Sequence, residues 1–184
     1  SMGGLMAMGI SALAPSRLTR VVLNDIGPVI AAQGLERIKG SVGSKMQFPD
    51  WSAAAAHLAQ VNSTAFPHYR SENWLRFAAR ACSQHSSEVT LDYDPNITAA
   101  LSSATSGLRP EDLWALFDTL ISTPALLIRG ALSDLLDSSC AEDMQRRHGA
   151  MEFLEVPGVG HAPMLDESGV SAAIIKFLSL PVGH

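Results

Sequence analysis

The feature that most restricts the fold of this chain is a set of short apolar runs, each followed by a turn with polar residues. The run Arg20–Asn24 contains β-branched residues and closes with Asp25-Ile26-Gly27-Pro28. Residues 124–130 form a second such run, and residues 151–156 form a third. Runs of this kind are typical of parallel strands that are buried on both faces. The chain is therefore predicted to be an α/β protein with polar groups at the carboxyl edge of a parallel sheet.

Helical patterns alternate with these strands. Residues 2–14 are apolar nearly all round and stop at Pro15, as in a buried helix followed by a turn. Ser139 and Glu142 have the spacing of a capping box, which predicts a helix that ends near residues 148–149. The last helix is predicted to bury an apolar face within residues 170–178. Two β-α units thus close the chain.

The middle of the chain has a different sequence pattern, which predicts mostly helices. Asp50 and Ser71 can each cap a helix, and Pro110 can open a third. Only residues 88–92 look like a strand there. A helical block inserted between buried strands suggests a lid over the carboxyl edge of the sheet. The predicted organisation is a core α/β part over 1–27, a helical cap over 28–120, and a second core part over 121–184.

Composition and charge argue against several classes of function. The 184-residue chain has a formal net charge of -5 and no basic run longer than Arg146-Arg147, so we expect no nucleic-acid partner. Cys82 and Cys140 lie far apart and suggest neither a metal pair nor a disulfide framework, which fits a reducing cytoplasm. No apolar stretch approaches the ~20 residues that cross a bilayer. We expect no membrane segment, no metal and no other cofactor.

Three residues could form a hydrolytic site. Ser1 is followed by Met2-Gly3-Gly4 and a helix, the second half of a tight strand-to-helix turn that can present a nucleophile. Asp134 and His161 each follow one of the late strands. An imidazole can take the proton of a serine hydroxyl, and a carboxylate on its other nitrogen fixes the tautomer. Ser1 is also compatible with a helix N-cap or with the remnant of a cleaved tag.

Four segments resemble the α/β-hydrolase fold family in its capped, esterase-like branch: Ser-Met-Gly-Gly, Leu-Asn-Asp-Ile-Gly-Pro, Leu-Leu-Ile-Arg-Gly-Ala-Leu-Ser-Asp and Val-Pro-Gly-Val-Gly-His-Ala-Pro. The order Ser, Asp, His is that of the family. The resemblance implies the sixth to eighth strands of the family sheet, with Ser1 as nucleophile, Asp134 as acid and His161 as base. It also implies that the backbone N–H of Met2 serves the oxyanion hole. Asp25 is an alternative acid, because some members place the carboxylate after the sixth strand.

This resemblance predicts a serine hydrolase of esters or related small acyl compounds. Carbon–carbon bond hydrolases and cofactor-free perhydrolases share the fold and stay open as alternatives. The resemblance covers about the second half of a family member, and the second oxyanion donor belongs to the other half. We therefore expect the chain alone to be nearly inactive, and a truncated fragment that acts only by association is the alternative. We also expect association through an exposed sheet edge, with a second copy or with the upstream half.

Overall fold

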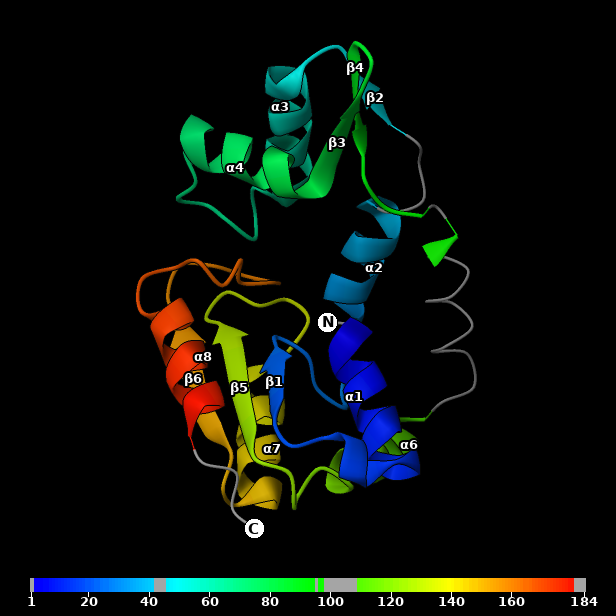
Figure 1. Ribbon diagram of the computed structural model, residues 1–184, viewed down its shortest axis with the longest axis vertical. Helices are drawn as coiled ribbons and strands as arrows, with labels where there is room; N and C mark the ends of the chain where they lie inside the picture. The colour runs from blue at the N-terminus through cyan, green and yellow to red at the C-terminus, as the bar shows by residue number, and fades with distance from the viewer. Residues whose placement is uncertain (1, 42–45, 95, 98–108, 181–184) are drawn as a thin grey trace. The chain divides into compact units, whose positions relative to one another are not determined.

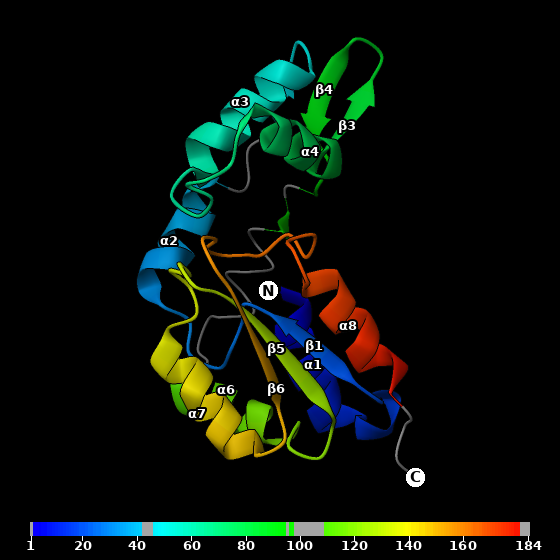
Figure 2. The same ribbon diagram turned by 90° about the vertical axis from the view of Figure 1, so that its left-hand side faces the viewer.

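The computed structural model describes residues 2–41, 46–94, 96–97 and 109–180, which fall into two compact units. Unit 1 comprises Ser1–Leu35 and Leu108–His184, and unit 2 comprises Glu36–Gly107. Figures 1 and 2 show the elements of both units. The lid role of the middle of the chain stays a prediction.

A three-stranded parallel sheet forms the centre of unit 1, as the apolar runs predict. Its strands are β1 (Val21–Asn24), β5 (Ala125–Gly130) and β6 (Glu152–Val156), in the order β1-β5-β6. Every residue of the central strand β5 is buried. Because all three strands are parallel, the loops that follow them meet at one edge of the sheet.

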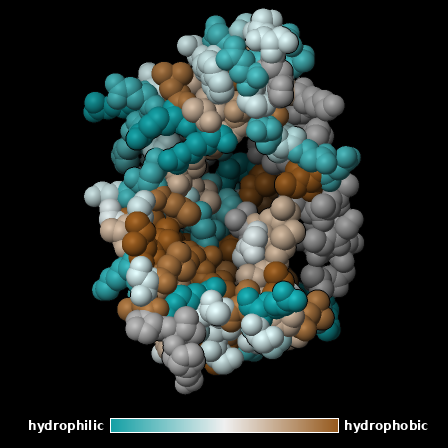
Figure 3. Space-filling view, viewed as in Figure 1, coloured by the Kyte–Doolittle hydropathy of each residue, from teal (hydrophilic) through white to brown (hydrophobic). Residues whose placement is uncertain are grey.

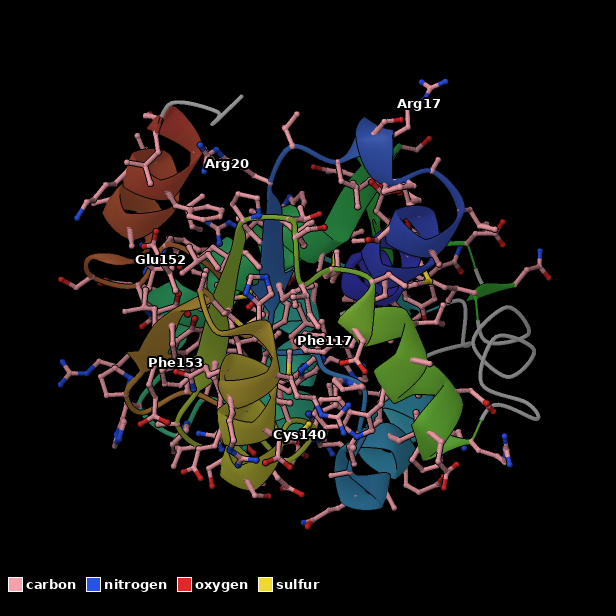
Figure 4. All side chains as sticks on the ribbon, turned by 90° about the horizontal axis from the view of Figure 1, so that it is seen from below. Arg17, Arg20, Phe117, Cys140, Glu152 and Phe153 are labelled. Atoms are coloured by element: carbon pink, nitrogen blue, oxygen red, sulfur yellow. The ribbon has the colours of Figure 1, made fainter. Side chains whose placement is uncertain are left out.

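In its described residues, unit 1 also has five helical segments and the start of a sixth. They are α1 (Met2–Leu13), the 3₁₀ turn η1 (Pro15–Arg17), α6 (Pro110–Asp118), α7 (Ser138–His148), α8 (Val170–Ser179) and the first residues of α2 (Ala32–Ser41). Figures 1 and 2 show α8 on one face of the sheet and α7 on the other. Phe117 of α6 is fully buried in this core, whereas Arg17 points outward (Figure 4). The layers are therefore those of an α/β protein.

The helix ends of unit 1 match the sequence in part. The helix over residues 2–14 and its stop at Pro15 are confirmed, because α1 ends at Leu13 and η1 follows. The capping box is wrong: α7 begins at Ser138 with Asp137 as its N-cap, so Ser139 already lies inside the helix. The predicted C-terminal end is confirmed by Gly149, whose φ of 73° suits a residue without Cβ.

The described residues of unit 2 include the second half of α2, two further complete helices and a small antiparallel sheet. Its elements are β2 (Gln47–Phe48), α3 (Trp51–Asn62), α4 (Ser71–Ala81), β3 (Cys82–His85) and β4 (Glu88–Leu91), and the strand order is β2-β4-β3. Asp50 caps α3 as predicted, accepting from Ala53 N at 2.8 Å. The cap predicted at Ser71 is one residue late, because Arg70 is the N-cap of α4.

Strand β3 was not predicted: Cys82 was expected on the inner face of the helix capped near Ser71, and no strand was expected before residue 88. Cys82 is extended, with φ -127° and ψ 155°, and it pairs with Leu91 of β4. The β3-β4 hairpin continues to His85 opposite Glu88. Pairing with a neighbouring strand therefore overrides the local helical pattern, as tertiary contacts often do.

Unit 1 exposes apolar side chains on two helices. Leu13 of α1 is 89% exposed, and Leu178 of α8, predicted to face the core, is 53% exposed. Figure 3 shows hydrophobic side chains gathered in the region of α8 and the neighbouring sheet. Within the described residues, β1 has a ladder partner on one side only, namely β5. None of the helices in the described ranges is both long and apolar enough to cross a membrane.

Candidate active site

A buried hydrogen bond joins the loop after β6 to the turn after β1. The Nδ1 atom of His161 lies 2.9 Å from Oδ2 of Asp25 and 3.0 Å from the Asp25 carbonyl oxygen. Both oxygens are acceptors, so Nδ1 is the donor of this contact, and in the neutral ring the basic nitrogen is then Nε2. Asp25 is fully buried and His161 is 9% exposed. The parallel order β1-β5-β6 brings together two residues that are 136 positions apart.

The carboxylate of Asp25 accepts hydrogen bonds from three directions. Oδ1 accepts from the backbone N–H of Gly130 at 2.9 Å, and Oδ2 accepts from the hydroxyl of Ser133 at 2.6 Å as well as from His161. A buried carboxylate needs such partners, because its unpaired burial would be costly. Asp25 has a positive φ of 53°, a conformation that Asp tolerates better than most residues. The turn therefore directs this side chain into the sheet edge.

The side chain that contacts the ring of His161 is that of Asp25, the alternative acid from the sequence. In a triad, the carboxylate partner of the base lies on the nitrogen that faces away from the nucleophile, and in this structure Asp25 holds Nδ1 of His161. Asp134, the first choice from the sequence, is half-buried, and its carbonyl accepts from Gly34 N at 3.0 Å. The alternative acid, Asp25, is therefore the better candidate. The sequence signal for it was a lone carboxylate at the very end of a buried strand.

The loop that carries His161 lies against the ends of two strands. The side-chain amide of Asn24 donates to the carbonyl of Pro163 at 2.9 Å, and Leu132 N donates to the Val159 carbonyl at 2.9 Å. A Cβ atom on Gly130 would lie 2.6 Å from the carbonyl oxygen of Val159, so this close approach requires glycine. The roles of Asn24, Gly130 and Ser133 were missed from the sequence.

The start of α1 lies close to the turn that carries Asp25. A Cβ atom on Gly4 would collide with Cγ2 of Ile26, the residue that follows Asp25, so glycine allows the helix to approach this turn. Met2, the expected oxyanion donor, is the first residue of α1. Ser1, the expected nucleophile, lies outside the described residues.

The described part of the chain gives less support to a metal site or to a cysteine nucleophile. No group of three or more His, Cys, Asp or Glu side chains in residues 2–41, 46–94, 96–97 and 109–180 could hold a metal ion. Burial raises the pKa of the Cys140 thiol, and burial followed by the nearby charge of Asp92 raises the pKa of the Cys82 thiol. A raised pKa leaves less thiolate, the reactive form of cysteine. Neither cysteine is therefore a good nucleophile.

Comparison with known proteins places this arrangement in a family context. No protein-family model matches the chain. It is 34% identical to the 3-hydroxybutyrate-oligomer hydrolase of Cupriavidus necator, in an alignment that covers 97% of this chain and 63% of the relative. The chain thus spans about three-fifths of the length of this relative.

Solved structures show the same architecture. The crystal structure of an α/β hydrolase from Novosphingobium aromaticivorans matches with a TM-score of 0.84 and 39% identity, covering 95% of this chain and 61% of that one. An esterase from Mycobacterium tuberculosis shares the fold with a TM-score of 0.63 and 21% identity, over 95% of this chain and 57% of that one. With its parallel sheet, its flanking helices and these neighbours, the chain has the architecture of part of the α/β-hydrolase fold.

Proposed function

We propose that this chain carries a serine hydrolase site for esters or related small acyl compounds, with Ser1 as nucleophile, His161 as base and Asp25 as acid. The observation that carries the proposal is the buried hydrogen bond from His161 Nδ1 to Asp25 Oδ2 at 2.9 Å. A carboxylate that holds Nδ1 orients the ring so that Nε2 is the nitrogen that acts as the base for a hydroxyl proton. Asp25 replaces Asp134 in the acid role.

The proposed reaction has two halves. His161 Nε2 takes the hydroxyl proton of Ser1 while the serine oxygen attacks the ester carbonyl carbon, and Asp25 stabilises the resulting imidazolium. The backbone N–H of Met2 donates to the oxyanion of the tetrahedral intermediate. The imidazolium then gives its proton to the departing alcohol, which leaves the acyl group on Ser1. Water repeats the same steps to release the acid and restore the serine.

The named activity of the Cupriavidus relative gives a first substrate class to test. 3-Hydroxybutyrate oligomers are chains of a short hydroxy acid joined by ester bonds, so they fit the proposed chemistry. A panel should contain the 3-hydroxybutyrate dimer, a p-nitrophenyl ester of a short acid and a carbon–carbon bond substrate. Hydrolysis of the first two without the third would favour an esterase over the alternative hydrolases of this fold.

A fluorophosphonate probe tests the nucleophile directly. Incubation of the full chain with the probe, followed by peptide mass spectrometry, should find the label on Ser1. His161→Ala should slow the labelling, because the hydroxyl proton then has no base to accept it. Circular dichroism of each sample establishes that the protein is folded. Folded wild-type protein that stays unlabelled at Ser1 would remove the proposal.

A second candidate function is association, which the surface of α1 favours. Its exposed apolar residues are Met6, Ile10 and Leu13. Exposed apolar patches commonly mark interaction sites, and a strand edge such as that of β1 can pair with another chain. We propose a second copy or an upstream segment of the family fold as the partner. Light scattering of the purified chain would show a dimer in the first case, and a stable monomer would contradict it.

The cytoplasmic location also remains a proposal. The structure records Cys82 and Cys140 as free and buried, which is compatible with a reducing compartment. Cell fractionation with an antibody against the chain would test it, and recovery in an oxidising compartment would contradict it.

A further inference from the structure

Ser133 lies in the turn after β5 and makes three hydrogen bonds through its hydroxyl. The hydroxyl accepts from Leu135 N at 3.2 Å and from Leu136 N at 3.0 Å, and it donates to Oδ2 of Asp25 at 2.6 Å. The turn itself is closed by a bond from Ser133 N to the carbonyl of Gly130 at 2.9 Å. The side chain therefore connects the turn after β5 to the carboxylate at the end of β1.

The direction of the bond to Asp25 follows from counting protons and lone pairs. A hydroxyl has one proton and two lone pairs. The two backbone N–H groups of Leu135 and Leu136 occupy the lone pairs, so the single proton is left for Asp25. Ser133 is thus held as a donor toward Asp25 and is not free to reverse its role.

This donor fixes the rotation of the carboxylate. Gly130 N holds Oδ1 and Ser133 holds Oδ2, so rotation about the Cβ–Cγ bond of Asp25 would break both bonds. In the observed orientation Oδ2 lies 2.9 Å from Nδ1 of His161. We propose that Ser133 is a positioning residue that aims Oδ2 of Asp25 at the His161 ring, an inference that rests on the proposed hydrolase function.

A purely structural role is the competing explanation, because Ser133 also satisfies two N–H groups of its own turn. The two roles make different predictions. Loss of a turn bond lowers stability but leaves the His161–Asp25 bond unchanged in protein that is still folded. Loss of the positioning bond weakens the His161–Asp25 contact and slows every step that needs the base.

Proton NMR of the full chain separates these roles without any need for turnover. The Nδ1 proton of His161, shared with a carboxylate, should give a resonance far downfield, and its assignment is checked by its absence in His161→Ala. In Ser133→Ala we expect this resonance to move upfield or to broaden through exchange with water. Ser133→Thr keeps the hydroxyl and should retain it. Ser139→Ala, which removes an exposed serine a few residues later, is the matched control and should not change it.

The kinetic arm uses fluorophosphonate labelling and hydrolysis of a p-nitrophenyl ester. Ser133→Ala should lower kcat and the labelling rate about tenfold with KM nearly unchanged, since a hydrogen bond to a charged group is lost where the base is oriented. If Ser133→Ala does not fold, Ser133→Cys serves instead, with a weaker donor and a smaller loss expected. A folded Ser133→Ala protein with an unchanged His161 resonance would overturn the inference. Absence of labelling in wild-type protein would count against the hydrolase instead.

Discussion

The turn after β1 and the turn after β5 look alike in the sequence but differ in the structure. Each follows a buried parallel strand and each offers an aspartate, Asp25 in the first and Asp134 in the second. The Asp25 carboxylate is fully buried among three donors, whereas Asp134 is half-buried and its backbone carbonyl holds Gly34. This convergence of buried donors on Asp25 is the reason to propose it as the acid, because position after a buried strand alone does not distinguish the two aspartates.

The strongest test of the proposed difference between Asp25 and Asp134 is to neutralise each aspartate separately. Asp25→Asn should lower kcat/KM for ester hydrolysis by about 10³ to 10⁴, as is typical when the acid of a triad becomes an amide and the wrong histidine tautomer is favoured. Asp134→Asn should lose less than about tenfold, because the backbone bond from Gly34 N to the Asp134 carbonyl persists. Steady-state kinetics on both variants, with melting curves as the control for folding, decides between them. The reverse order of effects would return the acid role to Asp134.

The strands and most helices of unit 1 could be predicted because their signals are local. The run Arg20–Asn24 identifies β1 from its own residues, and Pro15 stops α1 wherever the helix packs. The pairing of His161 with Asp25 could not be predicted in the same way. It depends on the strand order β1-β5-β6 and on the positive φ of Asp25, and neither of these can be predicted from a short segment of sequence.

Side-chain bonds and strand pairing were also beyond a single sequence. Ser133 is an ordinary turn residue until Asp25 is known to lie 2.6 Å away. Strand β3 consists of Cys82, Ser83, Gln84 and His85, which show no apolar alternation, so only its pairing with β4 identifies it.

Gly34 lies against the backbone of the turn after β5, so a substitution there tests how tightly α2 packs on this turn. A Cβ atom at this position in α2 would lie 2.5 Å from the carbonyl oxygen of Asp134, and backbone atoms cannot move aside as a flexible side chain can. Gly34→Ala should therefore destabilise the protein by about 2 kcal/mol, the usual scale of overpacking. Gly40→Ala on the same helix is the matched control, because among the described residues nothing beyond the helix's own backbone and chain neighbours lies within 4 Å of its Cβ position. Equal urea midpoints for the two variants would show that this close approach does not matter.

Gly4 of α1 lies against the turn after β1, so a substitution there tests how tightly α1 packs on this turn. Its Cβ atom would meet Cγ2 of Ile26, a side-chain atom that can partly yield, so Gly4→Ala should cost less than Gly34→Ala, about 1 kcal/mol. Because Ile26 follows Asp25, we also expect slower ester hydrolysis. Gly9→Ala, on the same helix and with open space at its Cβ position, should instead gain about 0.5 kcal/mol from helix propensity. Denaturation curves that place both variants on the same side of wild type would contradict this account.

The smallest expected effect concerns the support of the turn after β5 by Arg129. This buried arginine donates through Nε to the Leu136 carbonyl at 2.9 Å, and its guanidinium pairs with Glu155 across the β5-β6 ladder at 2.7 Å. Glu155 is half exposed, so solvent screens the pair, and Glu155→Gln should cost only about 0.5 kcal/mol.

The effect of Glu155→Gln on catalysis shows whether Arg129 and Glu155 stabilise only the turn after β5 or also help to position Asp25. The amide can still accept from Arg129 through its oxygen, so the bond to Leu136, and with it Ser133 and Asp25, should stay in place. Ester hydrolysis by Glu155→Gln should therefore match wild type, with a slightly lower urea midpoint whose difference shrinks at high salt. Kinetics and denaturation at two salt concentrations measure both quantities. If Glu155→Gln lost as much activity as Ser133→Ala, the charge of Glu155 would also be needed for catalysis. The hydrogen bonds around Asp25 would then not be enough to explain why the turn after β1 differs from the turn after β5.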